Sequence, residues 1–173
     1  LCLESKDDSM NQEILQEILR QDYTKIQEDI ISFLKNQISQ KKAEGVVFGL
    51  SGGIDSATVA YLCRKISETK EVLALVMPDS VISPSNETGD ALKIIGEIGI
   101  NYKLIDINTI HKRYSNYLEP GELALGNLRA RIRSNIIYYY ANLKNLLVLG
   151  TSDKSEYLIG YFTKFGDGSA DIL

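Results

Sequence analysis

The sequence predicts a doubly wound α/β domain, in which a mostly parallel sheet carries helices on both faces. Short apolar runs typical of buried strands recur along the chain, at residues 46–50, 71–77, 102–107 and 146–149. Helical patterns separate these runs, and strands that alternate with helices indicate parallel strands joined by right-handed crossovers. Ligands of such sheets bind at the carboxyl ends of the strands.

Composition limits the class of protein. The 173 residues suffice for one domain with its own core, and 44% hydrophobic and 24% charged residues are ordinary for a globular protein. A net charge of -4 argues against a nucleic-acid partner. No apolar run approaches the roughly 20 residues of a membrane span, and no signal-peptide pattern is visible. Cys2 and Cys63 form no disulfide or metal framework, so we expect a cytoplasmic protein.

The chain opens with a polar stretch, residues 1–9, which we expect to be a disordered extension of a single domain that spans residues 1–173. Residues 11–42 have a helical pattern with a possible break at Asp22. Their second apolar stripe is formed by Ile26, Ile30, Phe33, Leu34 and Ile38. We expect this stripe to pack on the sheet, with a dimer contact as the alternative.

The first strand runs directly into the hexapeptide S-G-G-I-D-S at residues 51–56, and an amphipathic helix follows. Two glycines allow the backbone to curl with its N–H groups inward, and the helix N-terminus adds partial positive charge. This combination is an anion nest, most often for phosphate. Ser51 and Ser56 add hydroxyl donors, and Asp55 adds a carboxylate suited to magnesium.

Three better-known motifs compete for this stretch. It lacks the Gly-Lys-Ser/Thr of a Walker A loop, and the glycine spacing of a dinucleotide-binding motif fails. Residues 49–53 do match G-x-S-x-G, the nucleophile elbow of hydrolases. We reject the elbow because several strands precede it in hydrolases, whereas a helical stretch does so here. His111 is also a poor candidate for the base, and we expect it at the surface.

Four helical patterns follow the loop helix. The second strand ends at Pro78-Asp79, and a helix is expected over residues 87–98 with Gly99 as its C-terminal stop. Further helices are expected over residues 110–118 and 123–143. A last one should begin near Glu156.

Polar residues are dense in residues 150–171, directly after the last strand. Thr151 offers a hydroxyl at a strand end, and Lys164 and Asp167 lie in a Gly-rich loop. Glu156 and Asp55 would come from neighbouring strand ends. Two carboxylates that meet there could share Mg²⁺ with the phosphates of ATP.

These motifs together resemble the NAD synthetases of the ammonia-dependent type, a family of N-type ATP pyrophosphatases. The residues that carry the resemblance are LSGGIDSA at 50–57, NLRARIR at 127–133 and GTSDKSEYLIGYFTKFGDGSAD at 150–171. It covers about residues 45–171 and implies a Rossmann-like fold of the adenine nucleotide alpha hydrolase type. It also implies a ligase that adenylates the carboxylate of deamido-NAD with Mg-ATP and aminates it with ammonia, giving NAD, AMP and pyrophosphate.

The resemblance implies a role for each matching position. Asp55 and Glu156 would bind Mg²⁺. Contacts to deamido-NAD would come from Arg131, Lys164 and Asp171. ATP would contact Gly49, Leu50, Ser51, Gly52, Gly53, Ile54, Asp55, Ser56 and Thr151. No covalent nucleophile is required, a homodimer is implied, and the chain looks truncated at its C-terminus relative to the family.

Three alternatives stay open. Two are other ATP pyrophosphatases, namely a synthetase module that aminates xanthylate and a tRNA thiolase. The third is a non-catalytic module that binds adenine nucleotides. Within the family pattern, Arg129, Arg131 and Arg133 are spaced by two and cannot all face one side of a helix. We favour Arg131 for substrate and expect the other two to be surface charges or salt-bridge partners.

Overall fold

The structure, a computed structural model, describes Gln16 and residues 20–173. The predicted extension and residues 11–15 and 17–19 at the start of the predicted N-terminal helix lie outside the described residues. The elements follow one another as α2 (Tyr23–Gln40), β1 (Gly45–Gly49), α3 (Ile54–Arg64), β2 (Glu71–Val76), α4 (Ser85–Ile98), β3 (Asn101–Leu104), α5 (Asn108–Ser115), α6 (Glu122–Lys144), β4 (Leu146–Val148) and α7 (Lys154–Ile159).

The four strands form one sheet in the order β3-β2-β1-β4, and every neighbouring pair is parallel. Val47 at the centre pairs with Leu73 on one side and with Val148 on the other. The chain builds outward from β1 to β3 and then returns to place β4 on the opposite side of β1. The predicted doubly wound α/β class is therefore confirmed.

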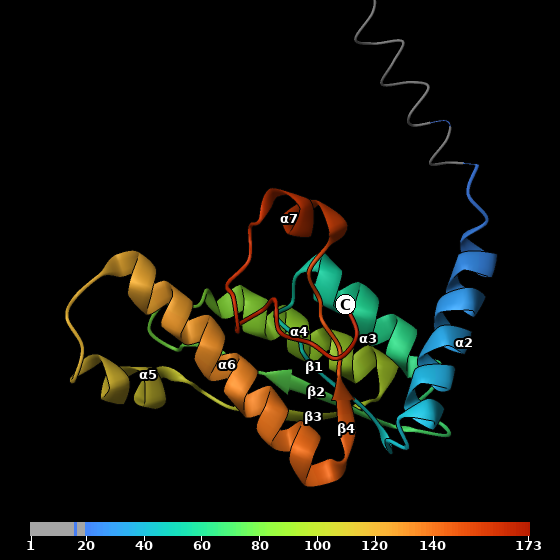
Figure 1. The fold of residues 1–173 in the computed structure, drawn as a ribbon, viewed down its shortest axis with the longest axis horizontal. Helices are drawn as coiled ribbons and strands as arrows, with labels where there is room; N and C mark the ends of the chain where they lie inside the picture. The colour runs from blue at the N-terminus through green and yellow to red at the C-terminus, as the bar shows by residue number, and fades with distance from the viewer. Residues whose placement is uncertain (1–15, 17–19) are drawn as a thin grey trace, which may run out of the picture.

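Alternate residues of the central strands point to opposite faces, and each face has its own buried cluster. Val46 and Phe48 face the cluster under α2, α3 and α4. Val47 faces the cluster under α6. Figure 1 shows the sheet edge-on between these two layers of helices. Cys63 packs in the first cluster with no exposed surface, as predicted, and burial raises the pKa of its thiol to about 12.

Local signals set several boundaries as the sequence predicts. Asp22 caps α2, accepting a hydrogen bond from the Lys25 N–H at 3.0 Å, so the predicted break is confirmed. Gly99 ends α4 with a φ of 64°, a left-handed conformation that glycine adopts at little cost. β3 ends at Leu104, earlier than predicted, although Ile107 beyond it still bonds to Pro78 O at 2.9 Å.

Two expectations about burial are corrected. Only part of the predicted stripe on α2 packs on the sheet: Leu34 and Ile38 are buried, whereas Ile26, Ile30 and Phe33 are exposed. The buried residues lie in the C-terminal half of α2, so periodicity marks the apolar face of the helix but not how much of its length is covered. His111, predicted at the surface, is 7% exposed because α5 turns it toward Asp79. Among the described residues, no helix is both long and apolar enough to cross a membrane.

Candidate functional site

The Gly-rich loop joins β1 to α3 and is held by its own serines. Ser51 Oγ lies 3.0 Å from Ser56 Oγ and accepts the Gly53 N–H at 3.2 Å. Ser56 Oγ in turn donates to Gly53 O at 3.0 Å. Gly52 has a φ of +94°, and a Cβ there would meet Glu87 O of α4 at 2.3 Å. Position 52 therefore requires glycine, because its φ is positive and because the neighbouring helix leaves no room for a side chain.

The loop presents a helix N-terminus to its surroundings. The first helical hydrogen bond of α3 runs from the Ala57 N–H to Gly53 O at 3.0 Å. The preceding amides, those of residues 54–56, have no partner within the helix. Free amides and the positive end of the helix dipole favour an anion at this point, as the sequence predicts.

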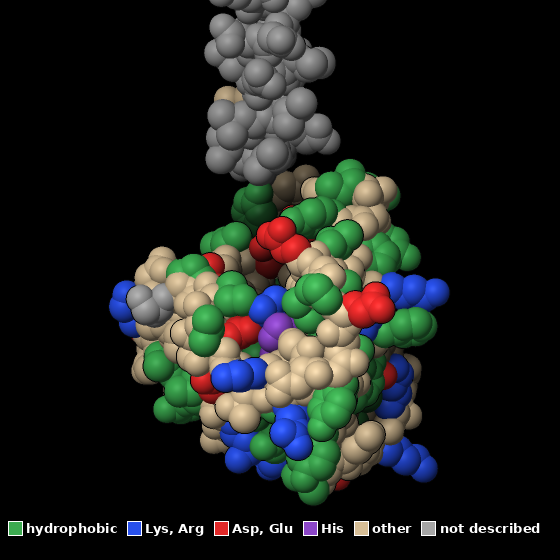
Figure 2. All heavy atoms as spheres, turned by 90° about the vertical axis from the view of Figure 1, so that its left-hand side faces the viewer, with side chains coloured by type: hydrophobic (Ala, Val, Ile, Leu, Met, Phe, Trp, Pro, Cys, Tyr) green, Lys and Arg blue, Asp and Glu red, His purple; other side chains and the backbone are tan. Residues whose placement is uncertain are grey.

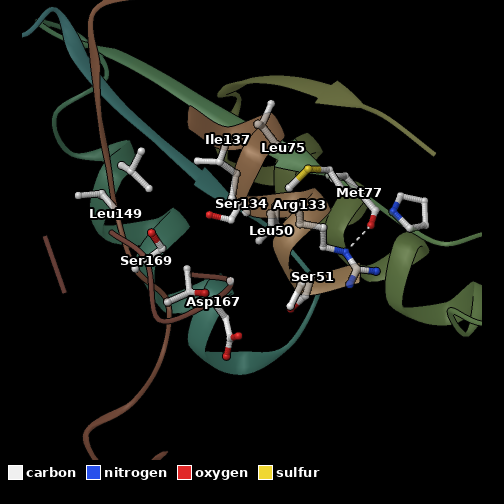
Figure 3. Close-up of a pocket in the computed structure, with 18 of the residues that line it drawn as sticks. Leu50, Ser51, Leu75, Met77, Arg133, Ser134, Ile137, Leu149, Asp167 and Ser169 are labelled. Carbon is white, nitrogen blue, oxygen red and sulfur yellow. Dashed lines mark hydrogen bonds between the residues drawn. The ribbon is translucent and has the colours of Figure 1, made fainter. Parts of the chain in front are cut away.

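A cavity of about 470 Å³ opens beside this loop, at the carboxyl ends of β1, β2 and β4. Its floor includes Leu50 and Ser51 after β1, Met77 after β2 and Leu149 after β4. This is the place where the chain reverses its direction of building between β1 and β4, which is where open α/β sheets bind ligands. Figure 3 shows Ile137, Ser134 and Arg133 of α6 on one side of it and Asp167 and Ser169 on the other.

The cavity brings together two stretches that lie far apart in the sequence. Gly49, Leu50 and Ser51 line it from the first motif, and Thr151 and Asp167 line it from the second. The other predicted ATP contacts, at residues 52–56, belong to the loop that borders it. Asp167 Oδ1 also accepts the Thr163 N–H at 2.9 Å, which holds the second loop, residues 163–168, in a turn.

Beyond Met77, the end of β2 carries a buried charged cluster that the sequence did not indicate. Asp79 is 1% exposed, and its Oδ2 accepts from Arg129 Nε at 2.7 Å. Its Oδ1 accepts from Asn108 Nδ2 at 2.9 Å and from the Val81 N–H at 3.3 Å. Burial by itself would raise the pKa of Asp79, but these hydrogen bonds outweigh it and hold the pKa below its usual value.

His111 borders the same cluster. Its Nδ1 lies 4.0 Å from Asp79 Oδ2, and its Nε2 is buried without a hydrogen-bond partner in the structure. Figure 2 shows the edge of this single imidazole between basic and acidic side chains, below a hollow in the surface. Such a cluster links residues 79, 108, 111 and 129, and no local pattern could have revealed the pairing.

The three arginines of α6 point in two directions. Arg129 pairs with Asp79, so its expected role as a salt-bridge partner is confirmed. Arg133 is half-buried, donates from Nε to Met77 O at 2.9 Å and lines the cavity, so it is neither of the two things expected of it. Arg131 is exposed on another face and donates from Nε to Lys164 O at 3.2 Å. The i, i+4 spacing of Arg129 and Arg133 could have indicated that these two arginines share one face of the helix and that Arg131 does not.

The two predicted metal ligands stand in the first turns of two helices. Asp55 is exposed at the start of α3. Glu156 is the third residue of α7, where its Oε2 accepts the Asp153 N–H at 3.3 Å and its own N–H donates to Asp153 Oδ1 at 2.7 Å. This is a capping box, so Glu156 has a structural role in any case. No group of three or more metal-ligating side chains occurs in the described ranges.

The predicted contacts for the second substrate lie outside the cavity lining. Lys164 is exposed, with Nζ 5.1 Å from the centroid of the Phe165 ring. The carboxylate of Asp171 accepts the Val148 N–H at 2.8 Å, and residue 172 forms a parallel bridge with Leu149. Asp171 thus also secures the chain end against the outer edge of β4.

Fold and site together define the class: a Rossmann-like α/β protein with a Gly-rich loop at a helix N-terminus and a cavity at its topological switch point. A profile of the NAD synthase family matches residues 26–173. The chain is 46% identical over 166 residues to an NH(3)-dependent NAD(+) synthetase of Staphylothermus marinus, covering 92% of this chain and 59% of that protein. The chain therefore belongs to the NAD synthase family.

Solved structures agree with this assignment. The NH3-dependent NAD synthetase of Campylobacter jejuni, solved with a nitrate ion, has 43% identity and a TM-score of 0.81 over 88% of this chain and 66% of that one. An NMN synthetase of Francisella tularensis has 36% identity and a TM-score of 0.82 over 87% and 63%. The chain spans about 60% of the length of the curated relatives it matches, 59%, 58% and 62% for three of them.

Proposed function

We propose that this chain carries the adenylating site of an ammonia-dependent NAD synthetase. The observation that supports it most directly is the cavity at the switch point, which joins Ser51 of the first motif to Thr151 and Asp167 of the second. Relatives at 46% and 43% identity carry names that state this activity. The adenine would enter the apolar part of the cavity beside Leu75 and Ile137, with the phosphates toward Ser51.

The reaction needs an activated acid, because a free carboxylate has no usable leaving group. An oxygen of the deamido-NAD carboxylate attacks the α-phosphorus of ATP, and the bond to pyrophosphate breaks. Ammonia then attacks the acyl carbon, AMP leaves, a proton is released, and the amide is formed. The free amides of residues 54–56 and the Ser51 hydroxyl would stabilise the departing pyrophosphate, while Ser56, whose hydroxyl donates to Gly53 O, would hold the loop in shape. No side chain needs to form a covalent bond, so the site works by positioning and charge.

Magnesium belongs to this proposal. Asp55 and Glu156 are the carboxylates that would hold it, together with phosphate oxygens and water, which suits an ion that keeps few protein ligands. Bound there, Mg²⁺ would neutralise charge on the phosphates. Glu156 fits because its capping bond uses only Oε2. The observed donor set is thus compatible with the ion.

Deamido-NAD would lie against the exposed cations rather than deep in the cavity. Arg131 lies on α6 and Lys164 in the loop of residues 163–168. The two residues meet through the hydrogen bond from Arg131 Nε to Lys164 O. Two neighbouring positive charges suit a dinucleotide with two phosphates. Asp171 would complete this group, as the resemblance implies.

Assembly and location are proposed with the same function. A homodimer in the cytoplasm would fit a chain with a buried thiol at Cys63 and exposed apolar side chains on α2. Residues 26–173 would act as one domain, since the family profile matches that whole range. Sedimentation of the purified chain would test the dimer.

The decisive assay follows pyrophosphate and NAD together. We expect pyrophosphate release that requires ATP, Mg²⁺ and deamido-NAD, and NAD only when ammonia is added. Pyrophosphate release that instead requires xanthylate or tRNA would contradict the proposal, and ATP binding with no turnover in a protein of the relatives' full length would favour a non-catalytic module.

A second substrate is worth including because one similar structure is an NMN synthetase. Its name implies amidation of the corresponding acid mononucleotide, which requires the same adenylating site. The two acids should therefore be supplied separately at equal concentration. A higher kcat/KM with the mononucleotide would move the assignment to NMN synthesis.

A further inference from the structure

The helix α6 sends two arginines, Arg129 and Arg133, toward the end of β2. They are four residues apart and therefore share one face of the helix. Arg129 is neutralised by Asp79 at 2.7 Å. Among the residues that the structure describes, Arg133 donates only to Met77 O, a neutral carbonyl, at 2.9 Å. The two cations therefore differ in their partners, since Arg129 has a counter-ion and Arg133 has a neutral acceptor.

Asp79 is not available to the second arginine. Its Oδ2 is taken by Arg129, and its Oδ1 accepts from Asn108 and from the backbone of Val81. Within the described part of the chain, no carboxylate oxygen lies within 4.0 Å of a nitrogen of Arg133. Glu87 attracts Arg133 from a longer distance.

A half-buried guanidinium without an ion pair is costly, because burial removes water and the carboxylates of Asp79 and Glu87 act on it only from beyond contact distance. Burial lowers the pKa of Arg133, while the charge of Asp79 opposes that effect. An arginine nevertheless stays protonated in proteins and offers five donors, of which the bond to Met77 uses one. Figure 3 shows that bond at one end of the guanidinium, with Ser51 and Ser134 lining the same cavity.

We propose that Arg133 binds a phosphate oxyanion of the nucleotide in this cavity. Met77 O fixes the guanidinium, and the pair of Arg129 with Asp79 leaves it free for the ligand, so these three act as positioning residues. A fork of N–H donors suits two phosphate oxygens. This inference depends on the proposed function only in that a nucleotide occupies the cavity.

The test compares a charged nucleotide with its neutral nucleoside. Calorimetry would measure the affinities of AMP and adenosine for the wild-type chain, Arg133→Met and Arg133→Lys. We expect Arg133→Met to bind AMP about 10- to 100-fold more weakly, as for the loss of a charged hydrogen bond, with adenosine unchanged. Arg133→Lys should recover part of the AMP affinity, because it keeps the charge but not the fork. Arg113→Met on α5, whose arginine is exposed, should change neither affinity.

The outcomes separate the two proposals. A wild-type chain that binds neither AMP nor adenosine would overturn the proposed function itself. Binding of both ligands with an unchanged AMP preference in Arg133→Met would overturn the role of Arg133 and leave the proposed function standing. If Arg133→Met does not fold, Arg133→Lys decides. A lowered AMP affinity with normal adenosine binding in that variant would still show that the guanidinium donors contact the phosphate. Glu87→Gln should strengthen AMP binding, and a loss there equal to that of Arg133→Met would contradict the assignment.

Discussion

Arg129 Nε lies 2.7 Å from Asp79 Oδ2, and this ion pair fastens the middle of α6 to the loop that follows β2. Asp79 is buried, and the Arg129 side chain is 19% exposed. Asn108, at the start of α5, donates a hydrogen bond to the other carboxylate oxygen of Asp79. One side chain therefore joins three segments at the carboxyl edge of the sheet, directly behind the cavity wall that carries Arg133.

Replacing Asp79 with Asn should destabilise the chain by about 3 kcal/mol, because Arg129 would keep its charge in a partly buried site without a counter-ion. Urea denaturation would measure the change in the free energy of unfolding. Asp90→Asn is the matched control. It removes the pair with Lys93, whose side chains are 48% and 74% exposed, and an exposed pair contributes about 0–1 kcal/mol. Equal effects of the two substitutions would contradict the structural role of Asp79.

The same carboxylate predicts a pH dependence. The folded state lowers the pKa of Asp79 below its usual value of 3.8, so its stabilising effect is fully present above the unfolded pKa. It should be lost as the pH falls through the folded pKa, that is, from about pH 5 downward. Asp106 adds an effect of the same sign, because hydrogen bonds from Ser80 and Asn108 lower its pKa. Urea denaturation at a series of pH values would measure the free energy of unfolding. Below about pH 5 this free energy should fall less steeply with decreasing pH for Asp79→Asn than for the wild-type chain.

Much of the fold could be predicted because its signals are local. The strand, loop and helix at residues 45–64 follow from an apolar run, two glycines and a helical stripe. The turn at Gly99 follows from one residue type. The burial of His111 and the pairing of Asp79 with Arg129 could not be predicted, since they join residues 32 and 50 positions apart, with no periodicity between them.

The candidate site likewise has some residues that local motifs reveal and others whose roles depend on packing. The motif residues Ser51 and Thr151 are found at one cavity, because both directly follow strands of one parallel sheet. The roles of the arginines of α6 depend on which face of the helix meets the sheet, and that face is set by the packing of Ile132 and Ala141 rather than by the charged residues. The sequence therefore favours Arg131 over Arg133, although Arg133 is the one that lines the cavity.

Gly52→Ala should destabilise the chain by about 1–3 kcal/mol and weaken ATP binding, because a φ of +94° strains any other residue and the new Cβ would press on Glu87 O. Gly96→Ala is the control. Gly96 lies within α4 with nothing within 4 Å of an added Cβ, so the substitution should stabilise by about 0.5–1 kcal/mol. Thermal unfolding and ATP calorimetry would measure both. A Gly52→Ala chain with normal stability and ATP affinity would show that the loop has more freedom than its contacts imply.

Asp55→Asn and Glu156→Gln should each remove the Mg²⁺-dependent part of ATP affinity, on the order of 10-fold if one charged ligand is lost. Calorimetry with ATP, with and without Mg²⁺, would measure it. Glu156→Gln is informative because an amide can still accept the Asp153 N–H and preserve the capping box. Unchanged helix stability with lost Mg²⁺ dependence would support a metal role. The same Mg²⁺ effect in the variants as in the wild-type chain would refute it.

Asp171 has two possible roles that substitutions can separate. Its carboxylate accepts the Val148 N–H at 2.8 Å, so Asp171→Ala should leave that edge amide without its acceptor and cost about 1 kcal/mol. Asp171→Asn keeps an oxygen acceptor and removes only the charge, so its free energy of unfolding should stay close to that of the wild-type chain. If the carboxylate also contacts deamido-NAD, Asp171→Asn should weaken binding of that substrate while the stability is retained. Urea denaturation and calorimetry on both variants would decide, and an Asn variant as unstable as the Ala variant would mean that β4 needs the charge itself.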